Sequence, residues 1–134
     1  IGIKIIGEKI TNDGSIEIQN IQKTDGLILI ADPLLLKDEQ RVMKLFEHME
    51  KIKKPIFAYH DLYIKFGASL VISADNPTIG RQIAHMMQLF NDKKEFIKIQ
   101  IPMGTNVIFN KKMVESLGIK YDVDALSVVN KVIQ

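Results

Sequence analysis

Cysteine is absent from this sequence of 134 residues. Its absence excludes disulfide bonds, thiol catalysis and cysteine metal ligands, and it is compatible with either a reducing or an oxidising compartment. No apolar run approaches the roughly 18 residues that cross a bilayer, because the longest candidate, 27–30, has only the length of a strand. The sequence therefore predicts a soluble domain without direct membrane insertion.

A strong excess of one charge is also missing. Lys and Arg number 18 against 16 Asp and Glu, which gives a formal net charge of +2. The basic residues are scattered among acidic ones and do not form the continuous stripe that a nucleic-acid backbone requires. We therefore expect no nucleic-acid partner and interpret the basic residues as parts of solvated faces.

The length predicts one domain with one core, spanning residues 1–134. A chain of this size buries roughly two-thirds of its unfolded surface when it folds. Its apolar fraction of 46% and charged fraction of 25% are those of an ordinary globular protein. The sequence begins with Ile1 and shows no signal-peptide pattern, so we interpret it as part of a longer or processed protein.

Short apolar runs alternate with amphipathic stretches. The runs at 27–31, 55–59 and 70–74 are bounded by turn residues, as is typical of strands in a parallel sheet that is buried on both faces. Apolar residues at three- and four-residue spacing predict helices at 38–52 and 77–90. We predict a three-layer α/β/α domain with a mostly parallel sheet, in which these three strands are neighbours and helices cover both faces.

The other segments carry weaker patterns. The helix predicted at 77–90 should turn one apolar face towards the core, formed by Ile79, Ile83, Met86, Met87 and Phe90. The remaining expectations are a strand within the isoleucine-rich segment 1–10, a short helix at 15–23, strands at 96–101 and 107–109, a helix at 111–117 and helical spacing in the tail 121–134.

Polar and aromatic residues follow the three predicted strands. Asp32 follows the first strand, Tyr59 and His60 follow the second, and Asp75 and Asn76 follow the third. Ligands of open parallel sheets bind beyond the carboxyl ends of the strands, so these residues form the candidate ligand site. The Tyr59 ring is suited to stack on a ligand, and either acid is suited to hold an ammonium or hydroxyl group. An alternative is that both acids only cap helices or close turns.

Patterns that would indicate catalysis or metal binding are missing. The sequence has no nucleophile-elbow motif, no phosphate-loop glycines and no dinucleotide-binding glycines. The histidines His48, His60 and His85 have no partner at metal-ligand spacing, and we expect them to be exposed. No nucleophile, base and orienting group can be assembled, so we expect no enzyme, no cofactor and no metal site. A phosphoacceptor receiver domain would need an acidic cluster after the first strand, where this chain has Gly7-Glu8-Lys9.

Four segments, taken in order, resemble the C-terminal half of bacterial ABC-transporter substrate-binding proteins. In the third segment Gly80 and Arg81 occupy the family's "Gr" position, and in the fourth Asn110, Leu117 and Gly118 are in register with the family's final motif. The resemblance covers nearly the whole chain. The segments are DGLILIADP at 25–33, KKPIFAY at 53–59, FGASLVISADNPTIGRQIAHMM at 66–87 and NVIFNKKMVESLGIKYDVDAL at 106–126.

The resemblance implies one lobe of a periplasmic-binding-protein-like receptor, in which two α/β lobes close on a small solute such as an amino acid or a sugar-like compound. It also implies a periplasmic or extracellular, membrane-anchored location and a membrane permease that recognises the closed state. The ligand loop departs from the family pattern, because only Asp32, shifted by one place, can replace the family's acid. An alternative is an extracytoplasmic sensor or input domain of a membrane signalling protein, which acts through ligand or protein contact with a partner domain.

Overall fold

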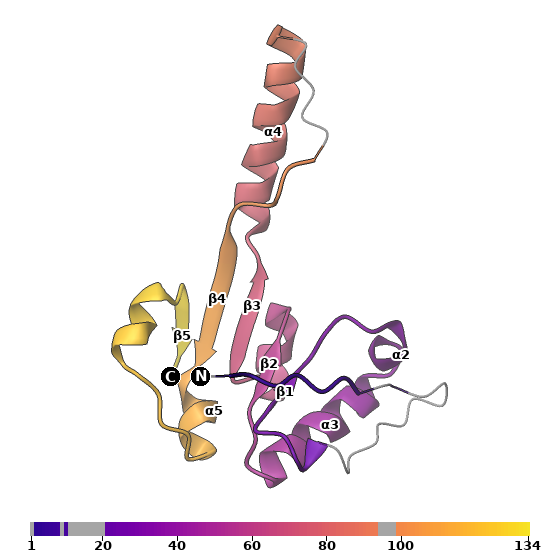
Figure 1. The fold of residues 1–134 in the computed structure, drawn as a ribbon, viewed down its shortest axis with the longest axis vertical. Helices are drawn as coiled ribbons and strands as arrows, with labels where there is room; N and C mark the ends of the chain where they lie inside the picture. Colours follow the sequence, from indigo (N-terminus) through magenta and orange to yellow (C-terminus); the bar gives the residue numbers. More distant parts are fainter. Residues whose placement is uncertain (1, 9, 11–20, 94–98) are drawn as a thin grey trace.

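The computed structural model describes residues 2–8, 10, 21–93 and 99–134. Its centre is a five-stranded sheet with the order β1-β2-β3-β4-β5 (Figure 1). Strands β1, β2 and β3 are parallel neighbours, β4 is antiparallel to β3, and β5 is parallel to β4. This arrangement confirms the predicted α/β class and the mostly parallel sheet. The strands are β1 Leu27–Ile28, β2 Ile56–Ala58, β3 Leu70–Ala74, β4 Thr105–Asn110 and β5 Lys131–Ile133.

The helices agree with the three clearest helical patterns of the sequence. The segments predicted at 38–52, 77–90 and 111–117 are helices whose ends differ from the prediction by a few residues at most. The α-helices are α2 Pro33–Leu36, α3 Glu39–Lys51, α4 Asn76–Lys93 and α5 Lys111–Ser116, and the 3-10 helices are η1 Asp61–Phe66 and η2 Asp124–Val128.

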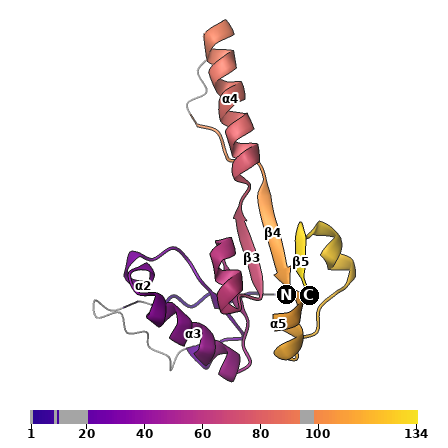
Figure 2. The ribbon, with the colours of Figure 1, turned by 180° about the vertical axis from the view of Figure 1, so that it is seen from behind.

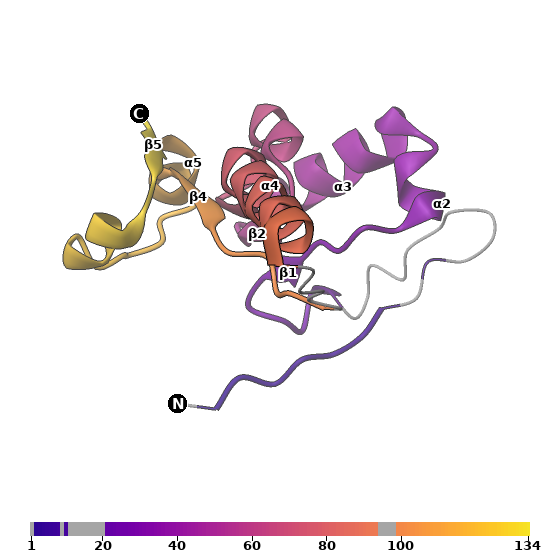
Figure 3. The same ribbon diagram turned by 90° about the horizontal axis from the view of Figure 1, so that it is seen from above.

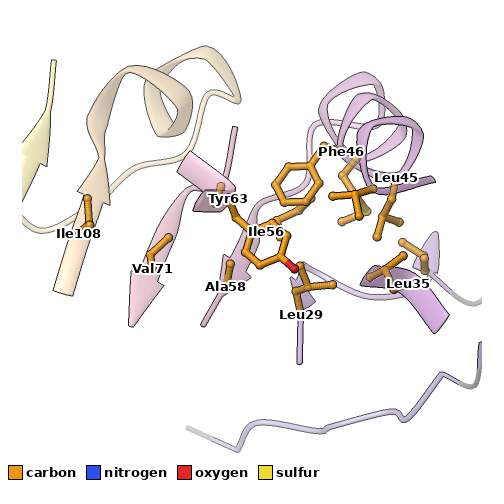
Figure 4. Packing of buried hydrophobic residues seen from close by; sticks show 13 residues of the cluster. Leu29, Leu35, Leu45, Phe46, Ile56, Ala58, Tyr63, Val71 and Ile108 are labelled. Carbon is orange, nitrogen blue, oxygen red and sulfur yellow. The ribbon is translucent and has the colours of Figure 1, made fainter. Parts of the chain in front are cut away.

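The core forms where α3 and η1 pack on the strands (Figure 4). Met49 of α3 and Val71 of β3 are fully buried, and the Phe46 and Tyr63 rings stack with centroids 6.0 Å apart. Burying a large apolar side chain stabilises a fold by about 1.5–3 kcal/mol, so this cluster is the main source of stability among the described residues. Its members are Ile21, Leu29, Leu35, Val42, Leu45, Phe46, Met49, Ile56, Ala58, Tyr63, Ala68, Val71 and Ile108.

The sheet face opposite α3 is open among the described residues. Ile28 of β1, Phe57 of β2 and Ile72 of β3 point away from the buried row and are exposed. In addition, β1 is one of the two edge strands of the described sheet, although its apolar run predicted a strand buried on both faces. The second covering layer that the sequence predicts therefore does not come from the part of the chain that the structure describes.

Three predicted elements differ from the structure in their described residues. Residues 2–8 and 10 form no strand, because no described strand pairs with them, and residues 2–8 run apart from the sheet (Figure 3). The tail forms η2 and then β5 instead of a longer helix, since its last residues pair with the outer edge of β4. Residues 99–101 form no strand either. Residues 1, 9, 15–20 and 96–98 of the predicted elements lie outside the described residues.

Helix α4 does not pack on the core. None of its residues is buried, and it projects from the rest of the molecule beyond the ends of β3 and β4 (Figures 1 and 2). The expectation that its apolar face points into the core was therefore wrong. The reason is strand length: β3 and β4 have 5 and 6 residues against 3 in β2, so they carry the start of α4 past the body of the domain.

Candidate functional site

The carboxyl ends of β1, β2 and β3 lie at one edge of the sheet, because the three strands are parallel neighbours. The residues predicted as a ligand site all follow these ends, and we refer to this part of the molecule as the site edge. Within the described part of the chain, no hydrogen bond or ring contact joins Tyr59 or His60, which follow β2, to the predicted residues that follow β1 and β3. The structure thus places the predicted residues on one edge without joining them into one network. They are Asp32, Tyr59, His60, Asp75 and Asn76.

Asp32 is the N-cap of α2. Its Oδ1 accepts hydrogen bonds from the backbone amides of Leu34 at 2.8 Å and Leu35 at 3.3 Å. Pro33 occupies the first helical position, where its missing N–H costs nothing and its fixed φ suits the helix. The capping role that the sequence left open for this acid is therefore its role in the structure, and one carboxylate oxygen is engaged by the backbone.

Tyr59 lies at the end of β2 beside a second tyrosine. The hydroxyl oxygens of Tyr59 and Tyr63 are 3.2 Å apart, and their ring centroids are 5.4 Å apart. Burial raises the pKa of the Tyr63 hydroxyl well above its usual value, and the hydrogen bond with Tyr59 acts in the same direction. Since Tyr63 is buried and Tyr59 is half-buried, Tyr59 presents a fixed aromatic wall at the site edge.

His60 is the N-cap of η1. Its Nδ1 accepts a hydrogen bond from the backbone amide of Leu62 at 3.1 Å, and its ring stands edge-on to Tyr59 with centroids 6.5 Å apart. An accepting Nδ1 leaves the proton of the neutral ring on Nε2. The exposed side chain therefore offers one N–H donor to a ligand.

Asp75 joins the end of β3 to α4. Its two carboxylate oxygens accept hydrogen bonds from the backbone amide and the hydroxyl of Thr78, at 3.3 and 2.5 Å. The hydrogen bond from the Thr78 hydroxyl contributes most to lowering the pKa of this carboxyl, and the hydrogen bond from the Thr78 amide contributes next. Arg81 donates to the same hydroxyl at 2.7 Å. Asp75 is thus a capping residue as well, whereas Asn76, the first residue of α4, is exposed.

The structure adds two residues to the site edge that sequence reasoning missed. The hydroxyl of Ser73 in β3 donates to Oδ1 of Asp61 in η1 at 2.6 Å. Asp61 is exposed, so its carboxylate is accessible to solvent. Asp61 directly follows His60, and Ser73 lies two positions after the buried Val71 on the same face of β3. This strand alternation was the signal that could have identified Ser73.

The histidines differ in their surroundings. His60 and His85 are exposed as predicted, but His48 of α3 is half-buried, and its Nε2 has no hydrogen-bond partner among the described residues. The expectation of an exposed His48 was wrong because the residue borders the buried face of α3, next to Met49. No group of three or more His, Asp or Glu side chains suited to a metal ion occurs among the residues that the structure describes.

A concavity of about 270 Å³ lies elsewhere, between Lys111, Lys112, Glu115 and Gln134. It is near the start of α5, which follows β4, and because β4 is antiparallel to β3 this is the amino-terminal side of the parallel strands.

Within the described part of the chain, no helix is long and apolar enough to cross a membrane.

No family model matches this sequence, and no curated protein does. Solved structures do match its fold. A conserved domain protein from Vibrio cholerae O1 biovar eltor superposes with a TM-score of 0.60 at 22% identity, over 83% of this chain and 37% of that chain. The ABC domain from Streptococcus pneumonia, solved in complex with L-Trp, superposes with a TM-score of 0.59 at 18% identity, over 87% of this chain and 40% of that chain.

The present chain thus spans about two-fifths of the length of these solved chains. At this level of identity the likeness establishes the fold, and it agrees with the family resemblance seen in the sequence. The chain therefore shares the α/β fold, with its mostly parallel sheet, of part of each of these two solved proteins.

Proposed function

We propose that this chain is a non-catalytic solute-binding domain of the kind found in ABC-transporter substrate-binding proteins. The observation that carries the proposal is the site edge, where an exposed carboxylate, a hydroxyl and an aromatic wall follow neighbouring parallel strands. The fold supports it, since ligands of such sheets bind at this edge. We expect an amino acid or a sugar-like compound as the ligand, in the periplasm or on a membrane-anchored extracellular protein, with a permease as partner.

Each group at the site edge has a distinct task in this proposal. The Asp61 carboxylate accepts from an ammonium or hydroxyl group of the solute, and the Ser73 hydroxyl holds that carboxylate in place. The Tyr59 ring covers the apolar part of the solute, and the Nε2 proton of His60 donates to a solute oxygen. Asp75 contributes indirectly, because both of its carboxylate oxygens accept hydrogen bonds from Thr78. Asp32 uses only its Oδ1 to cap α2.

The same geometry supports binding over catalysis. A nucleophilic triad needs a histidine between the serine and the acid. Here the Ser73 hydroxyl donates directly to Asp61, and Nδ1 of His60 faces the backbone amide of Leu62. The histidine that a triad places between serine and acid is therefore not in position, and the serine hydroxyl is held by the carboxylate itself.

The proposal is tested by titrating the chain with a library of amino acids and sugars, L-Trp included, while amide shifts are followed by NMR. We expect shifts at 59–61 and 73–76, with dissociation constants in the millimolar range, which corresponds to about 4 kcal/mol. Asp61→Asn should weaken binding several-fold, because the neutral amide lacks the charge-assisted hydrogen bond. Glu115→Gln is the matched control, since it removes one exposed carboxylate on the amino-terminal side of the strands.

Two outcomes contradict the proposal. One is a set of shifts that clusters at 111–115 and 134 and is lost in Glu115→Gln. The other is robust turnover in a hydrolase or phosphatase screen that Ser73→Ala or His60→Ala abolishes.

A further inference from the structure

The three helices that begin at the site edge are capped by the chain's own side chains. Asp32 accepts hydrogen bonds from first-turn amides of α2, His60 from an amide of η1, and Asp75 from an amide of α4. Such amides are the groups with which the start of a helix binds an anion. The capped amides are therefore closed to an anionic solute, and the Asp32 and Asp75 carboxylates repel one.

The cations on these helices are occupied or distant. Lys37 is the C-cap of α2, at the far end of that helix from the site edge. Lys65, in the last turn of η1, pairs with Glu39 of α3 at 3.0 Å. Arg81 of α4 donates to the Thr78 hydroxyl at 2.7 Å. None of these contacts brings a positive charge to the groups that we propose to hold the solute.

Tyr59 and Asp61 both favour a positive charge on the solute. Asp61 is exposed, and the Ser73 hydroxyl holds its carboxylate through a hydrogen bond of 2.6 Å. A carboxylate forms a charge-assisted hydrogen bond with an ammonium group. The Tyr59 ring, whose hydroxyl lies 3.2 Å from that of Tyr63, has a face that attracts cations. A solute therefore gains from an ammonium group at both residues and from a carboxylate at neither.

We propose that the site edge selects its solute by positive charge, because it binds an ammonium group and disfavours a carboxylate on the same solute. The solute class that fits best is an amine with an aromatic or apolar group, which covers the Tyr59 ring while the ammonium reaches Asp61. An amino acid with the same side chain binds more weakly, since its carboxylate comes close to the acids of the edge. This inference rests on the proposed function, because it names the solute class of the same site.

Three solutes that share an indole ring test the charge selection. Tryptamine carries the ammonium group alone, indole-3-propionate carries the carboxylate alone, and L-Trp, the solute of one solved structure with this fold, carries both. Each is titrated into the 134-residue chain while amide shifts at 59–61 and 73–76 are followed by NMR. We expect the dissociation constant of tryptamine to be about three- to fivefold lower than that of L-Trp, as for exposed charge pairs. Indole-3-propionate should not shift these amides.

Salt and two variants test whether charge is the cause. At about 0.5 M salt the difference between tryptamine and L-Trp should shrink, because exposed charges are screened. Asp61→Asn should weaken tryptamine binding several-fold and bring its affinity close to that of L-Trp. Glu115→Gln removes an exposed carboxylate on the other side of the parallel strands and should leave both affinities unchanged. Both altered residues are exposed, so the domain should stay folded, as its amide spectrum will report.

Three results overturn the inference and leave the proposed function standing. One is binding of L-Trp or indole-3-propionate at the site edge as tightly as tryptamine. Another is a loss of L-Trp affinity in Arg81→Gln, which would identify Arg81 as a residue that binds the carboxylate. The third is a sugar that shifts the amides of 59–61 and 73–76 while tryptamine does not. If no solute shifts these amides, the inference and the proposed function are both rejected.

Discussion

The hydroxyl oxygens of Tyr59 and Tyr63 lie 3.2 Å apart, one at the site edge and the other inside the core. This pair connects the aromatic wall of the site to the packing of Phe46 and Tyr63, whose rings stack almost in parallel, with an interplanar angle of 6°. A ligand on Tyr59 therefore contacts a side chain that the core holds in position. Preorganised aromatic groups lose little freedom when a ligand binds, which favours affinity.

The burial of Tyr63 predicts a loss of stability at alkaline pH. Its raised pKa means that the fold favours the neutral hydroxyl, so this contribution is complete below the unfolded pKa of about 10 and is lost as the pH rises above it. We expect Tyr63→Phe to lose less stability than the wild type between pH 8 and pH 11, as measured by urea unfolding. Equal losses in the two proteins would contradict this explanation.

Asp75 predicts the opposite pH dependence at the base of α4. The Thr78 hydrogen bonds lower its pKa, so the carboxylate contributes stability above the unfolded value of 3.8, and this contribution is lost as the pH falls below it. The protection of amides in the first turn of α4, measured relative to intrinsic exchange at each pH, should therefore fall on acidification in the wild type. In Asp75→Asn this protection should be low already at pH 7. Asp92→Asn, which removes a charge at the far end of the helix, should leave the first turn unchanged.

Gln82 predicts how firmly residues 99–104, which return along α4, are held. Its side-chain amide donates to the Ile101 carbonyl and accepts from the Met103 amide, and we call this pair of hydrogen bonds the clamp. Gln82→Ala removes both of them, so amide exchange at 101–103 should increase several-fold while β1–β3 remain protected. Gln88→Ala is the matched control, because Gln88 is exposed and lies outside the clamp. Unchanged exchange at 101–103 in Gln82→Ala would show that other contacts hold the segment.

Ser69 carries a buried hydroxyl without a hydrogen-bond partner among the described residues. A buried polar group that makes no hydrogen bond costs about 1–3 kcal/mol, so Ser69→Ala should leave the free energy of unfolding unchanged or raise it by about 1 kcal/mol. The buried Asn110 is the contrast, because its Oδ1 caps α5 through the Met113 amide at 3.1 Å. Asn110→Ala should lower the free energy of unfolding by about 1 kcal/mol in the same urea titration.

The correctly predicted strands and helices are those whose formation depends mainly on residues close to one another in the sequence. The apolar runs at 27–31, 55–59 and 70–74 each contain a strand with one buried face, as their composition favours. The spacing of Val42, Leu45 and Met49 leaves little choice but a helix packed on one side. Helix α4 has the same kind of spacing, but spacing only identifies the face that would be buried against a partner. Whether a partner is present depends on strand lengths and on segments beyond the helix.

The tail and part of the site depended on tertiary contacts. Val123, Leu126 and Val129 have helical spacing, yet the open edge of β4 recruits residues 131–133 as a strand. Asp32 and Asp75 could be placed at the site edge because each directly follows an apolar run that contains a strand. The Asp61–Ser73 hydrogen bond spans 12 residues and exists only because η1 folds back beside β3, which no local pattern indicates.

The hydrogen bonds of Asp75 at the start of α4 also decide how a small local change moves the whole helix. With 18 residues at about 1.5 Å each, the helix extends about 27 Å from its first turn. It is a lever, and a rotation of about 10° at Asp75 and Gly104 moves its tip by about 5 Å while hardly displacing the residues at its start. A rearrangement of a single hydrogen-bonded turn is therefore amplified into a movement the size of a side chain.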